Sequence, residues 1–473
     1  MHSNFIPRLV ISGLRGGGGK TILSLSIAAQ LKKRSLKVIP FKKGPDYIDA
    51  GWLARAAGSP CYNLDLFMMS PEQALGSFVE HAAGADAAII EGNRGLFDGV
   101  DHKGTYSTAA LAKLLHAPVI LSIDCTKTTN TAAALVLGCQ KMDLELNIAG
   151  VVLNRVATAR QEAVIRKAID VTCGIPVLGA IPRLQKDPFP ERHMGLTPFQ
   201  EHQGIAESIQ TVEDIGGEYL DMDAIMAIMR GAEVRFEGSG GRGQDSFGQV
   251  NLSSGKGLRI GVIRDSAFQF YYQENIEALE ARGAEIIEVS PLSEDSLPDI
   301  DALYIGGGFP ETHAIALADN EGFRGSLMQA IEKGLPVYAE CGGLMYLGES
   351  ILLEGKTYPM VGVFPLRFGL EKKPRAHGYT VVKVTGENPF FPMGTVLKGH
   401  EFHYSRVLND EEVDMEMAFE NQRGRGIFDN KDGICYKNVL AGYTHLHATG
   451  SPEWVDGMIK SAEEYRGAKA LRR

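Results

Sequence analysis

The chain has 473 residues, which is more than one hydrophobic core usually serves, and its 44% hydrophobic and 22% charged residues are typical of a globular protein. The net charge of -10 argues against sequence-independent binding to nucleic acid, and we expect neither a signal peptide nor a membrane-spanning helix. Six scattered cysteines without a CxxC pair argue against a disulfide framework and a zinc site, and favour a reducing cytoplasm.

Short Val- and Ile-rich runs alternate with helix-like segments along the chain. The first half has predicted strands at 8–13, 37–43, 87–92, 118–124 and 148–154, with predicted helices at 21–34 and 107–115. The second half has predicted strands at 259–265, 285–291, 302–308 and 336–340, again alternating with helices. This alternation predicts two α/β domains with mostly parallel sheets that are covered on both faces.

Residues 238–256 are rich in Gly and Ser and poor in apolar residues. Such a composition is typical of a linker, because it offers little apolar surface to bury. We therefore predict a first domain at 1–237 and a second domain at 257–473.

The segment ISGLRGGGGKT joins the first predicted strand to the first predicted helix. Its glycines let the backbone turn tightly and direct several N–H groups at one anion, and the helix start adds its positive dipole end. Lys20 would reach the terminal phosphates of a nucleotide, and the Thr21 hydroxyl would bind Mg²⁺. A flexible glycine turn is the alternative, but the flanking strand and helix and the intact Gly-Lys-Thr favour a nucleotide site.

The loop departs from the GxxxxGK[ST] pattern because position 14 is Leu. The spacing of Gly13 from Gly-Lys-Thr resembles dethiobiotin synthetase, whereas Arg15 before the glycines resembles the loop of the partitioning ATPases, with Arg in place of Lys. Either resemblance implies a P-loop nucleotide-binding domain. The residues that would hold ATP are Gly16, Gly17, Gly18, Gly19, Lys20 and Thr21.

Two acidic clusters follow, each at the end of a predicted strand. KKGPDYIDAGW carries Asp46 and Asp49, and IIEGNRGLFDG carries Glu91 and Asp98. The carboxyl ends of parallel strands meet at one edge of a sheet, where ligands bind, and Mg²⁺ prefers oxygen ligands. One such carboxylate alone would be a turn residue or a solvated charge, but four beside a phosphate loop predict a metal or substrate site.

The segment PVYAECGGLMYL is typical of a strand, a sharp turn and a helix, with Cys341 at the turn. A nucleophile at such a turn is exposed at the top of the sheet, and the helix N-terminus favours its thiolate. A cysteine nucleophile needs a base, which GYTHLHATG offers as His445 or His447. The glycine turn IGGGFPE would help to bind an oxyanion, with Gly308 and Gly342 as candidate N–H donors. A buried structural cysteine is the alternative.

These motifs together resemble one family. YAECGGLMYL, IGGGFPETH, GHEFHYS and GYTHLH look like the glutamine amidotransferase domain of the cobyrinate and cobyrate synthases, and the GKT loop, GPDYIDAGW, EGNRGLFDG, VVLNRV and PERHMGL match the same family. The chain is identified as a member of the cobyrinic acid a,c-diamide synthase family over nearly its whole length. The resemblance implies a dethiobiotin synthetase-like P-loop NTPase domain followed by a class I glutamine amidotransferase-like α/β domain.

The resemblance also implies an activity, that of a carbon–nitrogen ligase of cobalamin biosynthesis. The enzyme would use ATP, Mg²⁺ and glutamine to amidate the a- and c-acetate carboxylates of a tetrapyrrole acid through an acyl phosphate, and the acceptor that the family implies first is cobyrinate. It would work in the cytoplasm without nucleic acid or membrane, and whether it forms a homodimer stays open. The implied site residues are Cys341 as nucleophile, His445 as base, Asn154 for adenine, Thr21, Asp46 and Glu91 for Mg²⁺, and Asp49, Arg94 and Asp98 for the substrate.

One departure concerns the base. Most class I amidotransferases have a Glu two residues after the catalytic His, and this chain has His447 there. The cobyrinate family also lacks that Glu, so the departure agrees with the resemblance. It leaves open which residue orients His445.

A second departure concerns the acceptor. Asn93 and Arg94 stand where cobyrinate enzymes are usually apolar. Arg94 would pair with a carboxylate of another tetrapyrrole acid, such as sirohaem or nickel-sirohydrochlorin, or it would be a solvated loop charge. A further alternative is a partitioning-type ATPase switch, which Arg15 and the helical tail at 454–473 would support.

Overall fold

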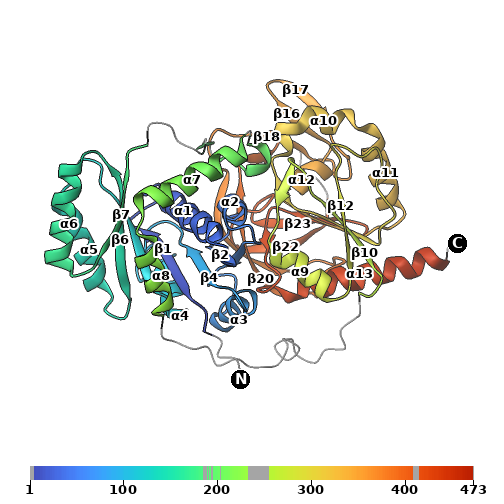
Figure 1. Ribbon diagram of the computed structural model, residues 1–473. Helices are drawn as coiled ribbons and strands as arrows, with labels where there is room; N and C mark the ends of the chain where they lie inside the picture. Colours follow the sequence, from blue (N-terminus) through green and yellow to red (C-terminus); the bar gives the residue numbers. More distant parts are fainter. Residues whose placement is uncertain are drawn as a thin grey trace. The chain divides into compact units, whose positions relative to one another are not determined.

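The computed structural model describes residues 5–184, 189, 191–192, 195–202, 204–232, 255–408 and 415–471. Contacts between Cα atoms divide the chain into two compact units, Met1–Gly240 and Gly241–Arg473. Figure 1 draws the first unit from blue to green and the second from yellow to red. The predicted linker at 238–256 lies almost entirely outside the described residues, so the proposed domain limits remain a prediction.

Within the described residues, the first unit is built on a seven-stranded sheet in which all neighbouring strands are parallel. Its strands are β1 (Arg8–Gly13), β2 (Val38–Lys43), β3 (Tyr62–Leu64), β4 (Ala87–Glu91), β5 (Val119–Asp124), β6 (Ile148–Val156) and β7 (Val177–Pro182), and a separate hairpin comprises β8 (Glu191–Arg192) and β9 (Gly195–Leu196). The order across the sheet is β3-β2-β4-β1-β5-β6-β7. Because β1 lies between β4 and β5, the glycine loop that follows it emerges near the middle of the carboxyl edge.

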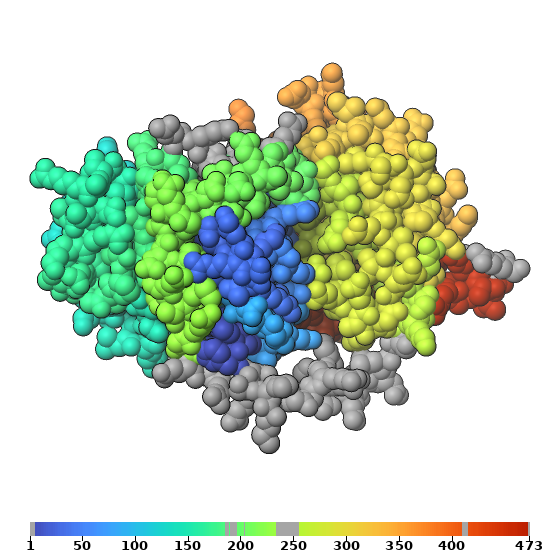
Figure 2. Space-filling view, in the orientation of Figure 1, coloured from blue at the N-terminus to red at the C-terminus, as the bar shows by residue number. Residues whose placement is uncertain are grey.

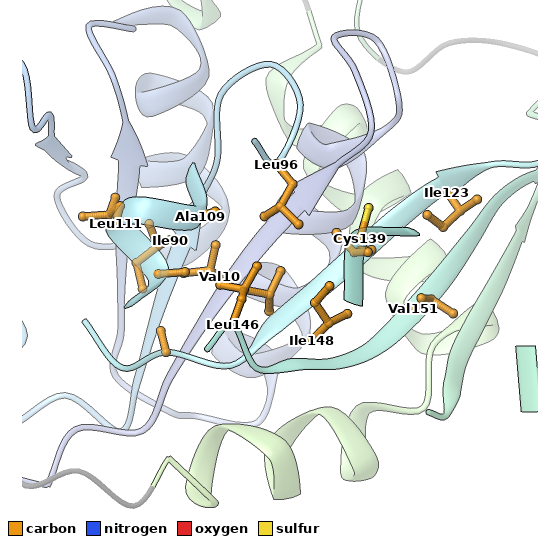
Figure 3. Close-up of a cluster of buried hydrophobic side chains, with 14 of the residues drawn as sticks. Val10, Ile90, Leu96, Ala109, Leu111, Ile123, Cys139, Leu146, Ile148 and Val151 are labelled. Atoms are coloured by element: carbon orange, nitrogen blue, oxygen red, sulfur yellow. The ribbon is translucent and has the colours of Figure 1, made fainter. Parts of the chain in front are cut away.

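Helices cover both faces of this sheet. One apolar layer lies under α1 (Lys20–Lys33), α2 (Ile48–Ala57), α7 (Ile205–Tyr219) and α8 (Met222–Arg230). The other lies under α3 (Pro71–His81), α4 (Thr108–Leu114), α5 (Thr131–Met142) and α6 (Ala159–Cys173), and a short 3-10 helix, η1 (Phe199–Glu201), precedes α7. Figure 3 shows part of the second layer, where Val10, Ile90 and Ile148 of the sheet lie near Leu111 and Cys139 of the helices.

Helix α1 is buried on most sides, because the sheet covers one side and α7 lies against another. The two helices approach closely at Gly216, where a Cβ would lie 2.7 Å from the carbonyl oxygen of Ser26. In the space-filling view, α7 and α8 adjoin α1 on one face of the first unit (Figure 2). This packing fixes the helix whose first turn carries Lys20 and Thr21.

Among the described residues, the second unit is built on a ten-stranded sheet of order β12-β10-β13-β15-β24-β23-β22-β19-β20-β25. Its strands are β10 (Arg259–Ile263), β12 (Glu285–Val289), β13 (Ala302–Ile305), β15 (Val337–Glu340), β19 (Ala376–Val384), β20 (Val396–His403), β22 (Met417–Arg423), β23 (Lys431–Tyr436), β24 (Val439–Gly442) and β25 (His445–Leu446). Smaller sheets pair β11 (Phe268–Phe270) with β14 (Gly307–Gly308), and β16 (Ser350–Leu353) with β17 (Lys356–Pro359), β18 (Arg367–Leu370) and β21 (Ser405–Val407).

The second sheet corrects the expectation of mostly parallel strands. The five strands from β12 to β24 pair in parallel, but the pairs from β24 to β25 are all antiparallel. Antiparallel sheets can leave one face in solvent, whereas parallel sheets are covered on both faces. In β19 buried and more exposed residues alternate along much of the strand, which fits an antiparallel sheet with one solvated face. The parallel half therefore carries the predicted nucleophile turn, and the antiparallel half returns the chain to β25.

Helices also cover both faces of the parallel half. They are α9 (Gln273–Ala281), α10 (Ala314–Asp319), α11 (Glu321–Glu332), α12 (Gly342–Leu347) and α13 (Pro452–Leu471), with a 3-10 helix η2 (Pro310–His313). Apolar side chains of α13 and α9 form one layer, and those of α10, α11 and α12 form the other. Among the described residues, no helix is long and apolar enough to cross a membrane.

Candidate active sites

The glycine loop turns the first residues of α1 toward the carboxyl edge of the first sheet. Gly17 and Gly19 adopt left-handed backbone angles, with φ of 67° and 87°. A Cβ on Gly19 would lie 1.8 Å from Nδ2 of Asn154, so only glycine fits there. The buried Lys20 ammonium donates to the carbonyl oxygen of Arg15 at 3.0 Å. The loop thus has the local geometry that the phosphate-loop prediction requires.

Asn154 packs beneath this loop. Its Nδ2 donates to the carbonyl oxygen of Gly18 at 3.3 Å, and its Oδ1 accepts from the backbone N–H of Arg155 at 2.9 Å. The side chain is buried. These contacts support the shape of the glycine loop, and the predicted contact of Asn154 with adenine remains a prediction.

The predicted carboxylates meet around a lysine that sequence reasoning missed. The Lys42 ammonium lies 2.6 Å from Oδ2 of Asp49, 2.6 Å from Oε1 of Glu91 and 3.6 Å from Oδ2 of Asp46. The same Glu91 oxygen accepts a hydrogen bond from the Thr21 hydroxyl at 2.9 Å. The structure therefore brings together the residues that were assigned to Mg²⁺ and part of those assigned to the substrate.

Burial and the neighbouring charges shift the pKa values of the residues in this cluster. Burial would lower the pKa of Lys42, but Asp49 and Glu91 raise it well above its ordinary value. Burial and the Asp49 charge raise the pKa of Asp46 to about 7, whereas the Lys42 charge outweighs burial and lowers the pKa of Asp49. Burial raises the pKa of Glu91. Asp49 is thus the carboxylate that most strongly keeps its negative charge.

The outer part of this edge comes from the loops after β2 and β4. The Nδ2 of Asn93 lies 2.9 Å from the position of a Cβ on Gly44, so the two loops adjoin, as neighbouring strands predict. Asp98 accepts from the backbone N–H of Gly95 at 2.8 Å. Burial lowers the pKa of Lys20, and the charges of Glu91 and, more weakly, Asp98 oppose that shift. Arg94 has a φ of 53° and is exposed. Its place agrees with a rim position, and its role remains a prediction.

The second site is centred on Cys341, which follows β15 directly and caps α12. Its backbone is strained, with φ 50° and ψ -96°, as expected for a nucleophile turn. Its N–H donates to the carbonyl oxygen of Gly442 at 2.7 Å, which fixes the turn. A Cβ on Gly342 would lie 3.0 Å from the backbone N of Gly308, so the two predicted oxyanion donors adjoin.

His445 lies beside this turn. Burial would lower its pKa, but hydrogen bonds with the Cys341 thiol and Glu340 raise the pKa to about 10. Its Nδ1 is 3.2 Å from Oε2 of Glu340. The ring packs against Gly307, where a Cβ would come within 2.5 Å of Cε1 of His445. His447 lies instead 3.5 Å from Oε1 of Glu274. Of the two candidate bases, His445 is therefore the one that contacts the cysteine.

Lys42 and Glu340 are the polar residues of these sites that the sequence reasoning missed. Each sits at the end of a fully buried strand, β2 or β15, and a charge there requires a partner. The apolar neighbours in each strand are a signal of that burial, but the partners of each charge come from distant parts of the folded chain.

A nucleotide-loop unit and a Cys–His glutaminase-like unit in one chain define the class of ATP-using glutamine amidotransferases. Two models of protein families match: "CobQ/CobB/MinD/ParA nucleotide binding domain" over residues 9–196 and "CobB/CobQ-like glutamine amidotransferase domain" over residues 259–453. Both units of the predicted fold class are confirmed.

Full-length relatives define the family more closely. The cobyrinate a,c-diamide synthase of Magnetococcus marinus is 43% identical over 449 residues, covering 95% of this chain and 96% of the relative. That of Archaeoglobus fulgidus is 38% identical over 463 residues, covering 97% and 98%. A solved structure, "Structure of PurLQS from Thermotoga maritima", aligns with a TM-score of 0.34 and 18% identity over 44% of this chain and 99% of that chain. The chain belongs to the cobyrinate a,c-diamide synthase family, and the predicted family is confirmed.

Proposed function

We propose that this chain uses ATP and glutamine to amidate the a- and c-acetate carboxylates of cobyrinate, as a carbon–nitrogen ligase. The observation that supports the proposal is the presence of two sets of contacts in one chain: a GKT loop whose Thr21 contacts Glu91, and a strained Cys341 in contact with His445. The names of relatives at 38% to 43% identity supply the acceptor. They give no support to sirohaem, nickel-sirohydrochlorin or a partitioning switch.

The glutaminase reaction follows from the second centre. His445 takes the proton of Cys341, and the resulting thiolate, paired with the protonated ring, attacks the carboxamide carbon of glutamine. The carbonyl oxygen becomes an oxyanion, for which the backbone N–H groups of Gly308 and Gly342 are the proposed donors. His445 then protonates the nitrogen, the C–N bond breaks, and ammonia and a γ-glutamyl thioester form. Water hydrolyses the thioester to glutamate and restores the thiol.

The residues of the first centre fit Mg²⁺. Within the described part of the chain, Oε2 of Glu91 is buried without a hydrogen-bond partner, and Oε1 contacts the Thr21 hydroxyl. No three His, Cys, Asp or Glu side chains of the described residues are grouped to hold a metal alone. Mg²⁺ suits such a site, because it is usually bound by one or two carboxylates, phosphate oxygens and water. Thr21, Glu91 and Asp46 would hold the ion, which would neutralise charge on the phosphates.

The amidation belongs to the same centre. Lys20 would bind the terminal phosphates while the γ-phosphoryl group passes from ATP to a substrate carboxylate. Ammonia attacks the carbonyl carbon of the acyl phosphate, phosphate leaves, and an amide remains. Asp49, Arg94 and Asp98 are the proposed substrate contacts. Lys42 would balance the negative charge of Asp49 and Glu91 while the ATP phosphates and the substrate carboxylates bind.

Mass spectrometry of the products tests the acceptor. The chain would be incubated with ATP, Mg²⁺, glutamine and, in parallel, cobyrinate, sirohaem and nickel-sirohydrochlorin. We expect replacement of OH by NH₂ on cobyrinate at two positions. Amidation of another tetrapyrrole acid in preference to cobyrinate would overturn the proposed acceptor, and absence of any amide would overturn the proposed reaction.

A further inference from the structure

Glu340 is a buried carboxylate that directly precedes Cys341. Its side chain is 1% exposed, so an ionised carboxylate there needs partners. Oε2 lies 3.2 Å from Nδ1 of His445 and accepts from the Tyr304 hydroxyl at 3.0 Å. Oε1 accepts from the backbone N–H of Leu446 at 3.0 Å. Both oxygens are therefore fixed, and one of them faces Nδ1 of His445.

The groups that bind the Glu340 carboxylate are themselves held by hydrogen bonds. Nδ2 of Asn275 donates to the Tyr304 hydroxyl at 3.3 Å and to the carbonyl oxygen of Leu446 at 3.0 Å. Tyr304 of β13 thus holds the Glu340 carboxylate, and Asn275 of α9 holds both the Tyr304 hydroxyl and the backbone at Leu446. A carboxylate restrained in this way keeps its partner ring in one orientation.

His447 occupies the position from which most class I amidotransferases supply the orienting Glu. Here its Nε2 lies 3.5 Å from Oε1 of Glu274, and its ring packs on Tyr272 with centroids 4.6 Å apart. Its imidazole is fully buried in that separate pair. The carboxylate beside His445 therefore comes from Glu340, on the nucleophile's own strand.

We propose that Glu340 is the positioning residue of His445 and replaces the missing Glu of the amidotransferase triad; this assignment rests on the proposed glutaminase function. Nδ1–H of His445 donates to Glu340, which leaves Nε2 to accept the proton of the Cys341 thiol. The carboxylate also stabilises the imidazolium that forms. Because Glu340 and Cys341 are adjacent in the chain, one backbone segment sets both the nucleophile and the orientation of its base.

Glu340→Gln tests the assignment without changing the side-chain shape. A Gln amide donating to Nδ1 would favour the tautomer with its proton on Nε2, which cannot accept the thiol proton. We expect kcat for glutamine hydrolysis to fall about 10²- to 10⁴-fold, as for loss of the orienting carboxylate in other triads. KM for glutamine should stay within about threefold, because Glu340 touches no substrate. The alkaline limb of the pH profile should move to lower pH, and amidation with added ammonia should persist.

Two further variants separate positioning from folding. Glu274→Gln removes an equally buried carboxylate beside the neighbouring His447, and it should leave glutamine hydrolysis within about threefold of wild type. Tyr304→Phe keeps the Glu340 carboxylate but removes one of its donors, and kcat should fall about tenfold with KM unchanged. If Glu340→Gln does not fold, an unchanged kcat in Tyr304→Phe overturns the assignment.

The outcomes also separate this assignment from the proposed function. A folded Glu340→Gln chain that hydrolyses glutamine at the wild-type rate, with an unchanged pH profile, overturns the role of Glu340 alone. A wild-type chain that releases no glutamate from glutamine overturns the proposed glutaminase and the assignment with it. A wild-type chain that hydrolyses glutamine but does not amidate cobyrinate overturns only the acceptor.

Discussion

The ammonium of Lys42 lies 2.6 Å from Oε1 of Glu91, the oxygen that also accepts from the Thr21 hydroxyl. Lys42 and Glu91 are 2% and 0% exposed, so neither charge is screened by solvent. The Lys42 ammonium thus links the end of β2 to the start of α1 through one carboxylate oxygen. A change in this ion pair should therefore affect both the phosphate loop and the nearby carboxylates of the protein that are proposed to bind the substrate.

Lys42→Met should abolish ATP-dependent amidation and destabilise the first unit. The variant leaves buried carboxylates without their cation, which costs on the order of 3–5 kcal/mol. Glutamine hydrolysis, measured as glutamate release, should persist. Lys33→Met serves as the control, because it removes an exposed ion pair with Glu213 and should change neither activity. Normal amidation by Lys42→Met would contradict this role.

Cys341→Ala should abolish amidation from glutamine but keep amidation from added ammonia. The reason is that Cys341 only releases ammonia in the proposed reaction, whereas the carboxylate is activated in the first centre. Cys435→Ala is the matched control, since it removes another buried thiol and should retain both activities. If a folded Cys341→Ala chain loses both activities, the two centres do not divide the reaction in this way.

Thr21→Val should remove ATP-dependent amidation, whereas Thr21→Ser should keep much of it. Val has nearly the same shape as Thr but lacks the hydroxyl that contacts Glu91 and would bind Mg²⁺. Lys20→Ala should also remove amidation, because the terminal phosphates lose their cation. Both can be measured with added ammonia, while glutamate release serves as the folding control. Full amidation by Lys20→Ala would show that the glycine loop is not the phosphate site.

The first sheet illustrates what the sequence could predict. Asp46, Asp49 and Glu91 could be placed at one edge, because each follows a Val- or Ile-rich run and parallel strands end together. Lys42 could not be placed with them from its residue type, since a lysine near a strand end is usually solvated. Its burial depends on the carboxylates that surround it in the folded chain.

The second sheet shows where prediction failed. The contact of Glu340 with His445 joins residues 105 positions apart, and it depends on the antiparallel strands that return the chain to β25. Those strands lack the alternation with helices that identified the parallel half. The nucleophile turn could be predicted because its glycines and strained backbone are local. The residue that orients the base could not, because it is defined by a distant pairing.

The pH dependence of glutamine hydrolysis should reflect the pairing of His445. Its pKa is about 10 in the folded chain, above the ordinary value of 6.5, because contacts with Cys341 and Glu340 outweigh burial. The stabilisation from the protonated ring is therefore complete below about pH 6.5 and is lost as pH rises through about 10. We expect kcat/KM for glutamine to fall only near or above about pH 10, because the ring must protonate the departing nitrogen. An alkaline limb near neutrality would contradict the pairing.

The last prediction concerns recognition of the acceptor by Arg94. The loop that carries Arg94 adjoins the loop after β2 through Asn93 and Gly44. Burial lowers the pKa of Lys43, the charge of Asp65 opposes this shift, and the exposed guanidinium of Arg94 lowers the pKa further. A tetrapyrrole polycarboxylate bound at this edge presents carboxylates that do not react, and these require donors. A charge-assisted Arg–carboxylate pair contributes about 1.5–3 kcal/mol, which corresponds to roughly tenfold to a hundredfold in affinity.

Arg94→Met should therefore raise KM for the tetrapyrrole acid by about tenfold or more and leave KM for ATP nearly unchanged. Steady-state amidation with added ammonia measures both constants without involving the glutaminase. Lys103→Met is the matched control, because Lys103 is also an exposed cation after β4, and it should alter neither constant. If Arg94→Met behaves like this control, Arg94 is a solvated loop charge, and recognition of the spare carboxylates must rest with other donors at the edge of the first sheet.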